Sequence, residues 1–203
     1  MQTLSDSEVE SWCRAVGVSL IEWRTLCFTN ATGGTFEFNI PATSGQMIAL
    51  VIVMTAIDDE LGIPSDSHLL WLRDWDIWGE EFEAIGRKTL SGLRSTFGEQ
   101  RPLLGASGHL FGASERVDLQ TFLVQPLFFE WDAYIVPSSG EYVLLLSHDG
   151  WIRIASRSAE VAQSMFVRYA HWNPRFVTPV AVSTTTGVTQ PEERRGGSVP
   201  AVE

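Results

Sequence analysis

Three residues that are typical of catalytic sites, Ser147, His148 and Asp149, stand side by side in the stretch YVLLLSHDGWIRIAS. They are the residue types of a nucleophilic triad, and a histidine with an aspartate also suggests a metal site. Consecutive residues of a strand point to alternate faces, so these three cannot form a relay among themselves. Asp-Gly between two alternating apolar runs instead indicates a hairpin turn. We therefore expect a turn from which His148 and Asp149 contact a partner.

A second candidate is His109 in the glycine-rich stretch GASGHLFGASE, residues 105–115. The stretch matches neither of the common phosphate-binding glycine patterns, so it predicts no nucleotide cofactor. A lone histidine in such a loop is more often a structural hydrogen-bonding group. If His109 and Glu115 met His148 and Asp149 in space, the four would form a metal or acid–base site. A small hydrolase or metal-dependent enzyme is therefore one alternative, although no spacing requires a metal or a cofactor.

Two acidic segments are candidates for binding a partner. WLRDWDIWGEE, residues 71–81, combines three tryptophans with carboxylates, and aromatic anchors flanked by charges are typical of binding hot spots. Alternatively, the tryptophans belong to the core. DDE, residues 58–60, ends an apolar helix, where carboxylates oppose the helix macrodipole. The partner-binding residues predicted from these segments and from the turn are Asp58, Asp59, Glu60, Asp74, Asp76, Glu80, His148 and Asp149.

The composition favours a globular, acidic protein. The chain has 203 residues, 44% of them hydrophobic, which is enough for one sizeable domain. It carries 14 basic and 25 acidic side chains, a net charge of −11. Such a surface disfavours nucleic acid and anionic membrane surfaces, and it suits either solubility or a basic protein partner. The oligomeric state is left open by the composition.

The sequence pattern favours a cytoplasmic protein. The first residues show no basic leader followed by an apolar block, and the longest apolar run, residues 47–57, is too short to span a bilayer. Cys13 and Cys27 form neither a CxxC motif nor a zinc spacing. Cys13 falls on the apolar face of a predicted helix, so we expect a buried free thiol there.

The helices and strands that must position these residues can be predicted along most of the chain. A capping box of Ser5 and Glu8 begins a helix that ends at Gly17. Residues 22–28 and 35–40 read as a hairpin, and Thr43 begins a long apolar helix. Residues 68–75 read as a strand, 79–97 and 115–125 as helices, and 98–114 as loop. Pro126 is expected to break the second of these helices.

The C-terminal third gives the clearest prediction. Residues 131–137, 141–147 and 151–156 read as a three-stranded antiparallel meander, and Ser158 caps a following helix. We therefore predict a single α+β domain, residues 1–178, with an antiparallel or mixed sheet covered by helices. Residues 179–203 read as a flexible tail.

The short motifs DWDIW, GHLF, E..D, WDAY and SHD follow in this order between about residues 70 and 170. In these motifs and in overall type the chain resembles immunity proteins of bacterial toxin systems, which are acidic α+β domains without a catalytic motif. The resemblance implies only a class, a non-enzymatic inhibitor of a cognate toxin. It assigns no individual residues. From the acidic segments we expect their carboxylates to meet a basic active-site cleft and shut out its substrate. A further alternative, a structural subunit of a phage or secretion assembly, would expose an extensive apolar patch and self-associate.

Overall fold

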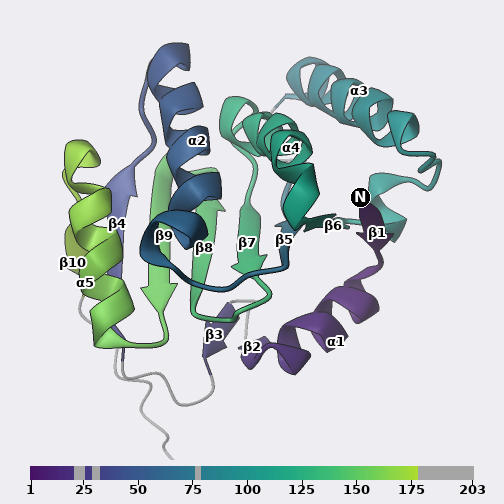
Figure 1. Cartoon of the computed structure of the whole chain (residues 1–203). Helices are drawn as coiled ribbons and strands as arrows, with labels where there is room; N and C mark the ends of the chain where they lie inside the picture. The colour runs from purple at the N-terminus through teal and green to yellow at the C-terminus, as the bar shows by residue number, and fades with distance from the viewer. Residues whose placement is uncertain (21–25, 29–32, 76–78, 178–203) are drawn as a thin grey trace, which may run out of the picture.

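An eight-stranded antiparallel sheet forms the centre of the computed structural model, which describes residues 1–20, 26–28, 33–75 and 79–177 (Figure 1). Its strand order is β1-β6-β5-β7-β8-β9-β4-β10, and every described pair is antiparallel. The strands are β1 (Gln2–Leu4), β4 (Thr35–Asn39), β5 (Ser67–Leu72), β6 (Gly108–Gly112), β7 (Ala133–Pro137), β8 (Tyr142–Ser147), β9 (Trp151–Ser156) and β10 (Arg175–Val177).

Five α-helices are described, and a short hairpin of β2 (Val18–Leu20) and β3 (Leu26–Phe28) is separate from the main sheet. Ser5, Thr43 and Ser158 precede helices as their residue types predict. The helices are α1 (Asp6–Ala15), α2 (Ser44–Leu61), α3 (Glu80–Thr96), α4 (Arg116–Phe128) and α5 (Ala159–Arg168), with short 3-10 turns at Leu103–Gly105, Ala113–Glu115 and Ala170–Trp172.

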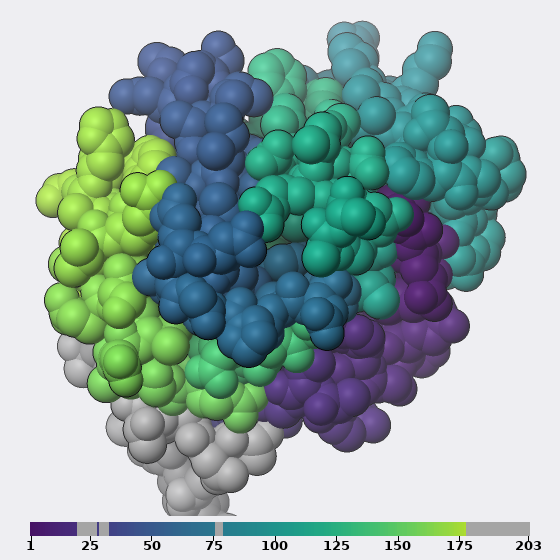
Figure 2. All heavy atoms as spheres, in the orientation of Figure 1, coloured from purple at the N-terminus to yellow at the C-terminus, as the bar shows by residue number. Residues whose placement is uncertain are grey.

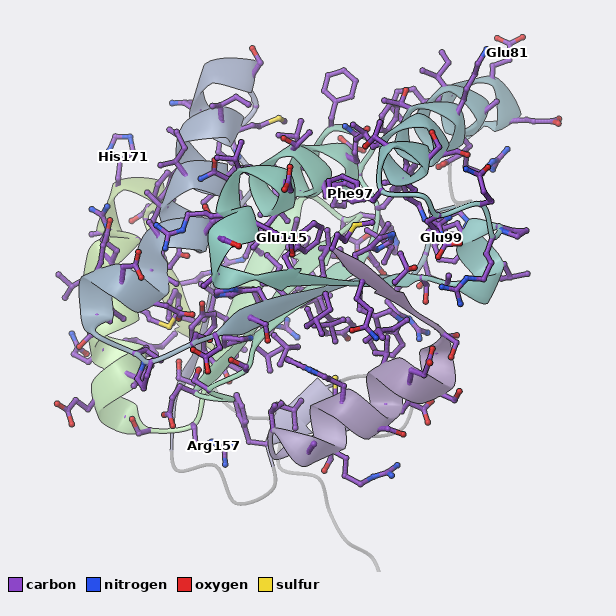
Figure 3. The ribbon with its side chains drawn as sticks, turned by 45° about the vertical axis from the view of Figure 1, so that its right-hand side comes forward. Glu81, Phe97, Glu99, Glu115, Arg157 and His171 are labelled. Carbon is purple, nitrogen blue, oxygen red and sulfur yellow. The ribbon has the colours of Figure 1, made fainter. Side chains whose placement is uncertain are left out.

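Helices lie on both faces of the sheet, with α2, α4 and α5 on one side and α1 on the other (Figure 3). Successive side chains of a strand point to opposite faces, so each strand contributes residues to the cores on both sides of the sheet. In β5, for example, Leu70 and Leu72 pack into the core under α2 and α4, whereas Leu69 and Trp71 pack toward α1. The predicted α+β domain with its C-terminal meander and following helix is confirmed.

Three local predictions differ from the structure. β3 pairs with β2, and β4 pairs with β9 and β10, so residues 26–28 and 35–39 do not form a hairpin. Phe36 and Phe38 of β4 are buried in the larger core, which fixes that strand beside β9. Residues 108–112, expected as loop, form β6 because they pair on both sides with β1 and β5.

The third difference is at Pro126, where α4 continues to Phe128 instead of ending. A proline inside a helix removes one backbone donor, the one that would bond the carbonyl four residues earlier. Pro126 and Leu127 are both buried against the core, and this packing carries the helix past the lost bond. The predicted tail, residues 179–203, lies outside the described residues.

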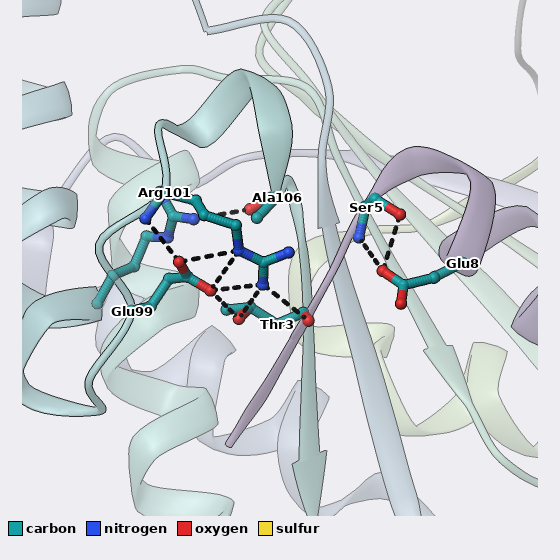
Figure 4. A network of polar contacts seen from close by, with 7 residues as sticks. Thr3, Ser5, Glu8, Glu99, Arg101 and Ala106 are labelled. Carbon is teal, nitrogen blue, oxygen red and sulfur yellow. Dashed lines mark hydrogen bonds and ion pairs between the residues drawn. The ribbon is translucent and has the colours of Figure 1, made fainter.

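The N-terminal strand is held at the sheet edge by a polar network (Figure 4). Arg101 donates to Thr3 Oγ1 at 2.9 Å and to Glu99 Oε1 at 3.0 Å, and Thr3 also bonds to Glu99. Arg101 first and Thr3 second hold the pKa of Glu99 well below its usual range.

Cys13 of α1 is buried as predicted, and this burial raises the pKa of its thiol to about 12. Within the described part of the chain, no helix has the length and apolar character needed to cross a membrane.

Candidate functional site

The stretch that contains Ser147, His148 and Asp149 is a hairpin turn between β8 and β9. Ser147 pairs with Trp151, and the amide of Gly150 donates to the carbonyl of Ser147 at 3.0 Å. Gly150 has φ +81°, a conformation that glycine adopts without a steric penalty. The Ser147 hydroxyl accepts the Asp149 amide at 3.2 Å instead of reaching the histidine ring. The turn prediction is confirmed, and the three residues do not form a relay.

His148 is held between two carboxylates. Its ring Nδ1 lies 2.8 Å from Asp132 Oδ1, and its backbone N–H donates to the same oxygen at 2.7 Å. On the other side of the ring, Nε2 lies 3.6 Å from Asp149 Oδ1. A carboxylate on one ring nitrogen fixes the orientation of an imidazole. The partly exposed ring of His148 is therefore a rigid part of this surface.

Asp132 was not predicted from the sequence, because its place beside His148 depends on the pairing of β7 with β8. It stands one residue before β7, and Ala133 pairs with Leu146, so Asp132 falls beside the end of β8. Asp132 also links the turn to β5. Its amide donates to the Asp74 carbonyl at 3.0 Å, and its carbonyl accepts from the Arg73 amide at 2.8 Å.

The structure thereby brings together two regions that are far apart in sequence. Asp74, just after β5, and Asp149, in the turn after β8, meet around Asp132 and His148 at one end of the sheet. Asp74 and Asp149 are exposed. We call this surface of Asp74, Asp132, His148 and Asp149 the acidic end. Glu80 is exposed at the first position of α3, and Asp76 lies outside the described residues.

In the predicted cluster at residues 58–60, Asp58 is buried, whereas Asp59 and Glu60 are exposed and paired with cations. Asp58 is buried and contacts His68, with its Oδ2 2.7 Å from the ring Nε2. Asp59 pairs with Arg116 of α4, and Glu60 pairs with Arg168 of α5. Two of the carboxylates that oppose the macrodipole of α2 are thus paired with cations from neighbouring helices, and the third contacts a histidine of β5. Asp58 lacks the exposure that a partner contact requires.

The surroundings of Asp58 form a small polar cavity at the opposite end of β5 from the acidic end. A cavity of about 40 Å³ is lined by Thr55, Ser65, His68, Arg116 and other residues. Behind it, burial first and the Asp58 carboxylate second raise the pKa of Tyr142 well above its usual range. Asp58 Oδ1 and the hydroxyls of Tyr142 and Tyr169 are buried. A volume of this size holds a water molecule or two.

His109 and Glu115 do not join His148. His109 pairs through Leu70 and Ile135 with Leu144, so three strand spacings of about 4.8 Å each separate it from β8. His148 lies a further four residues along the chain from Leu144. Burial first, and the nearby Arg94 guanidinium second, lower the pKa of His109 to about 3, so its ring is neutral.

Glu115 instead accepts the Gly112 amide at 2.8 Å and pairs with the N-terminal amino group. Within residues 1–20, 26–28, 33–75 and 79–177, no three His, Cys, Asp or Glu side chains are grouped so as to hold a metal ion. His109 and Glu115 therefore do not converge with His148 and Asp149 in one site.

Comparison of the chain with protein-family models, with curated proteins and with solved structures finds no match. The fold and the site define the class: a single α+β domain with an acidic end built on the ends of three neighbouring strands.

Proposed function

We propose that the chain is a protein-binding module, most concretely an immunity-type inhibitor that occludes a cognate bacterial toxin. The observation that carries the proposal is the acidic end, where Asp132 and Asp149 lie on either side of the His148 ring and the exposed Asp74 is joined to Asp132 through its backbone. A surface of this kind suits a partner whose active-site cleft is basic. The net charge of −11 adds long-range attraction toward such a partner.

The proposed interaction depends on how firmly the acidic end is held. Asp132 is fixed by two backbone hydrogen bonds to the segment of Arg73 and Asp74, and its carboxylate accepts from both the backbone and the ring of His148. Groups that are ordered before binding lose little conformational entropy in the complex. The inhibitor would therefore present its carboxylates in one arrangement and shut the substrate out of the cleft.

Reversal of two charges at the acidic end tests the proposal. The wild-type chain and Asp74→Lys/Asp149→Lys would each be co-expressed with the product of the neighbouring gene, and the affinity of the purified pair would be measured. We expect the wild type to suppress toxicity. The double variant should weaken binding by about tenfold or more and lower the association rate, because two attractive charges become repulsive.

Glu10→Lys/Glu160→Lys is the matched control, since it changes the net charge equally at exposed sites on α1 and α5. It should keep most of the affinity. Three outcomes would overturn the proposal: a neighbouring product that is not toxic alone, toxicity that persists beside the wild type, or equal loss of binding in both double variants.

A further inference from the structure

Helix α2 presents an uncharged surface that is partly exposed. Helix α2 carries no charged side chain from Ser44 to Ile57. A helix that is apolar on all sides is expected to be covered on all sides. The sheet covers one side of α2 and α4 lies against another, yet Ile48 and Ile52, one turn apart, are 47% and 51% exposed.

Helix α4 continues this surface beside α2 (Figures 1 and 2). Val117 near its start is 72% exposed and Phe128 at its end is 57% exposed. Between the two helices lies a hollow of about 220 Å³. It is lined by Ile48, Val51, Ile52, Val117, Gln120, Thr121 and Val124. A smaller hollow of about 40 Å³ is lined by apolar side chains around Met47, Val124 and Leu127. We call the surface of Ile48, Ile52, Val117, Val124 and Phe128 the apolar face.

We propose that the apolar face is the interface of a symmetric homodimer. A two-fold interface uses the same patch on both copies, so the patch must fit itself. The apolar face meets this condition because it carries both projecting side chains, such as Ile52 and Phe128, and the hollows that receive them.

Charge singles out the apolar face as the place where a second copy can approach. Two copies with a net charge of −11 each repel one another over most approaches. The α2 side of the apolar face is the exception, because no acidic side chain interrupts it from Ser44 to Ile57. A basic partner would gain nothing from charge at this place, whereas it would at the acidic end.

The apolar face also extends toward α3. Phe129 contacts both Phe128 and Phe82, each at 5.2 Å between ring centroids, and Phe82 and Ile85 are exposed on α3. A stable dimer buries about 800 Å² on each copy. The side chains of α3 widen the surface beyond the area that α2 and α4 offer alone.

Sedimentation of the full chain over about 1 to 100 µM tests the proposal, because a dimer responds to protein concentration. We expect the wild type to sediment as a dimer. Ile52→Glu and Val117→Glu should each raise the dimer dissociation constant by at least about tenfold, since a dimer would bury an unpaired carboxylate. Val167→Glu is the matched control: Val167 is 64% exposed on α5, outside the apolar face, and its variant should remain dimeric.

Circular dichroism identifies any variant that fails to fold, and the two test positions lie on different helices so that one folded variant is sufficient. A wild type that is monomeric over the whole range would overturn the proposal. So would folded Ile52→Glu and Val117→Glu variants that dimerise as the wild type does, or dissociation that Val167→Glu causes equally. None of these measurements involves a toxin, so they are independent of the proposed function.

Discussion

Burial decides what each histidine of this protein can do. His109 is fully enclosed beside Phe122 and stays neutral, whereas His148 is partly exposed and held by Asp132. His68 is mostly buried and contacts the buried carboxylate of Asp58. Of these three, His148 combines access from solvent with a ring held by a carboxylate, and it is therefore the histidine that the proposed function uses.

The buried ring of His109 predicts a specific dependence of stability on pH. Its pKa is about 3 in the folded protein and about 6.5 in the unfolded chain, so the unfolded state binds the proton first. The free energy of unfolding contributed by this residue is fully present above pH 6.5 and is lost as the pH falls toward 3, by up to about 1.4 kcal/mol per pH unit.

His109→Leu removes this titration while keeping an apolar side chain of similar volume in the core. We expect urea unfolding at several pH values between 7 and 4 to show a shallower loss of stability for the variant than for the wild type, by close to one proton. Parallel pH profiles of the two proteins would show that the folded state protonates His109 as readily as the unfolded chain does.

At the residue scale, sequence reasoning found the exposed groups and missed their buried partners. His148 and Asp149 stand beside the Asp-Gly turn signal, which marks exposure locally, and Asp74 stands in the acidic segment 71–81. Asp132 and the contact between Asp58 and His68 depend on the pairing of strands and on the packing of α2 over β5. A single sequence does not contain that information, because the contacts join positions that are distant along the chain.

Among the elements, α3 shows how a glycine can be required inside a helix. A Cβ atom at Gly86 would lie 2.6 Å from Trp131 Cζ2 and 2.9 Å from Phe129 Cγ. The rings of Phe129 and Trp131 stack, and Trp131 Nε1 donates to Glu83 of the same helix at 2.9 Å. Gly86 therefore allows α3 to approach these rings closely. Gly92, one and a half turns further on, has no neighbour within 4 Å of such an atom.

The two glycines of α3 give opposite predictions for the same substitution. Gly86→Ala should lower the free energy of unfolding by about 1 to 3 kcal/mol, because the added methyl group overpacks the contact with Trp131. Gly92→Ala should raise it by about 0.5 to 1 kcal/mol, because alanine favours an exposed helix interior. Denaturant unfolding of both variants measures the difference. Equal effects would mean that α3 does not pack closely on the rings.

Element starts were predictable where a local signal exists. Ser5, Thr43 and Ser158 cap helices, and Asp149-Gly150 marks the β8–β9 turn. Strand pairing was less predictable, since β4 reaches β9 and β10 across more than a hundred residues. The register of such pairs follows from which face must be buried, and this depends on the whole set of strands.

For the molecule as a whole, the central sheet is shared by two cores. Val9 of α1 packs on one face with Leu69 and Trp71, and Leu50 of α2 packs on the other with Leu70 and Leu72. Because neighbouring residues of one strand enter different cores, neither core can come apart while the strand keeps its pairing. We infer that the domain unfolds as one cooperative unit.

Truncation on each face tests this cooperativity. Val9→Ala and Leu50→Ala each remove buried methyl groups, so we expect losses of about 1 to 3 and about 2 to 5 kcal/mol respectively. Tryptophan fluorescence reports both sides, because Trp71 lies in the α1 core and Trp131 in the α2 core. At one fixed protein concentration, fluorescence and far-UV circular dichroism should give a single, coincident transition for both variants. An early transition confined to Val9→Ala would mean that α1 and its core detach while the rest of the sheet remains folded.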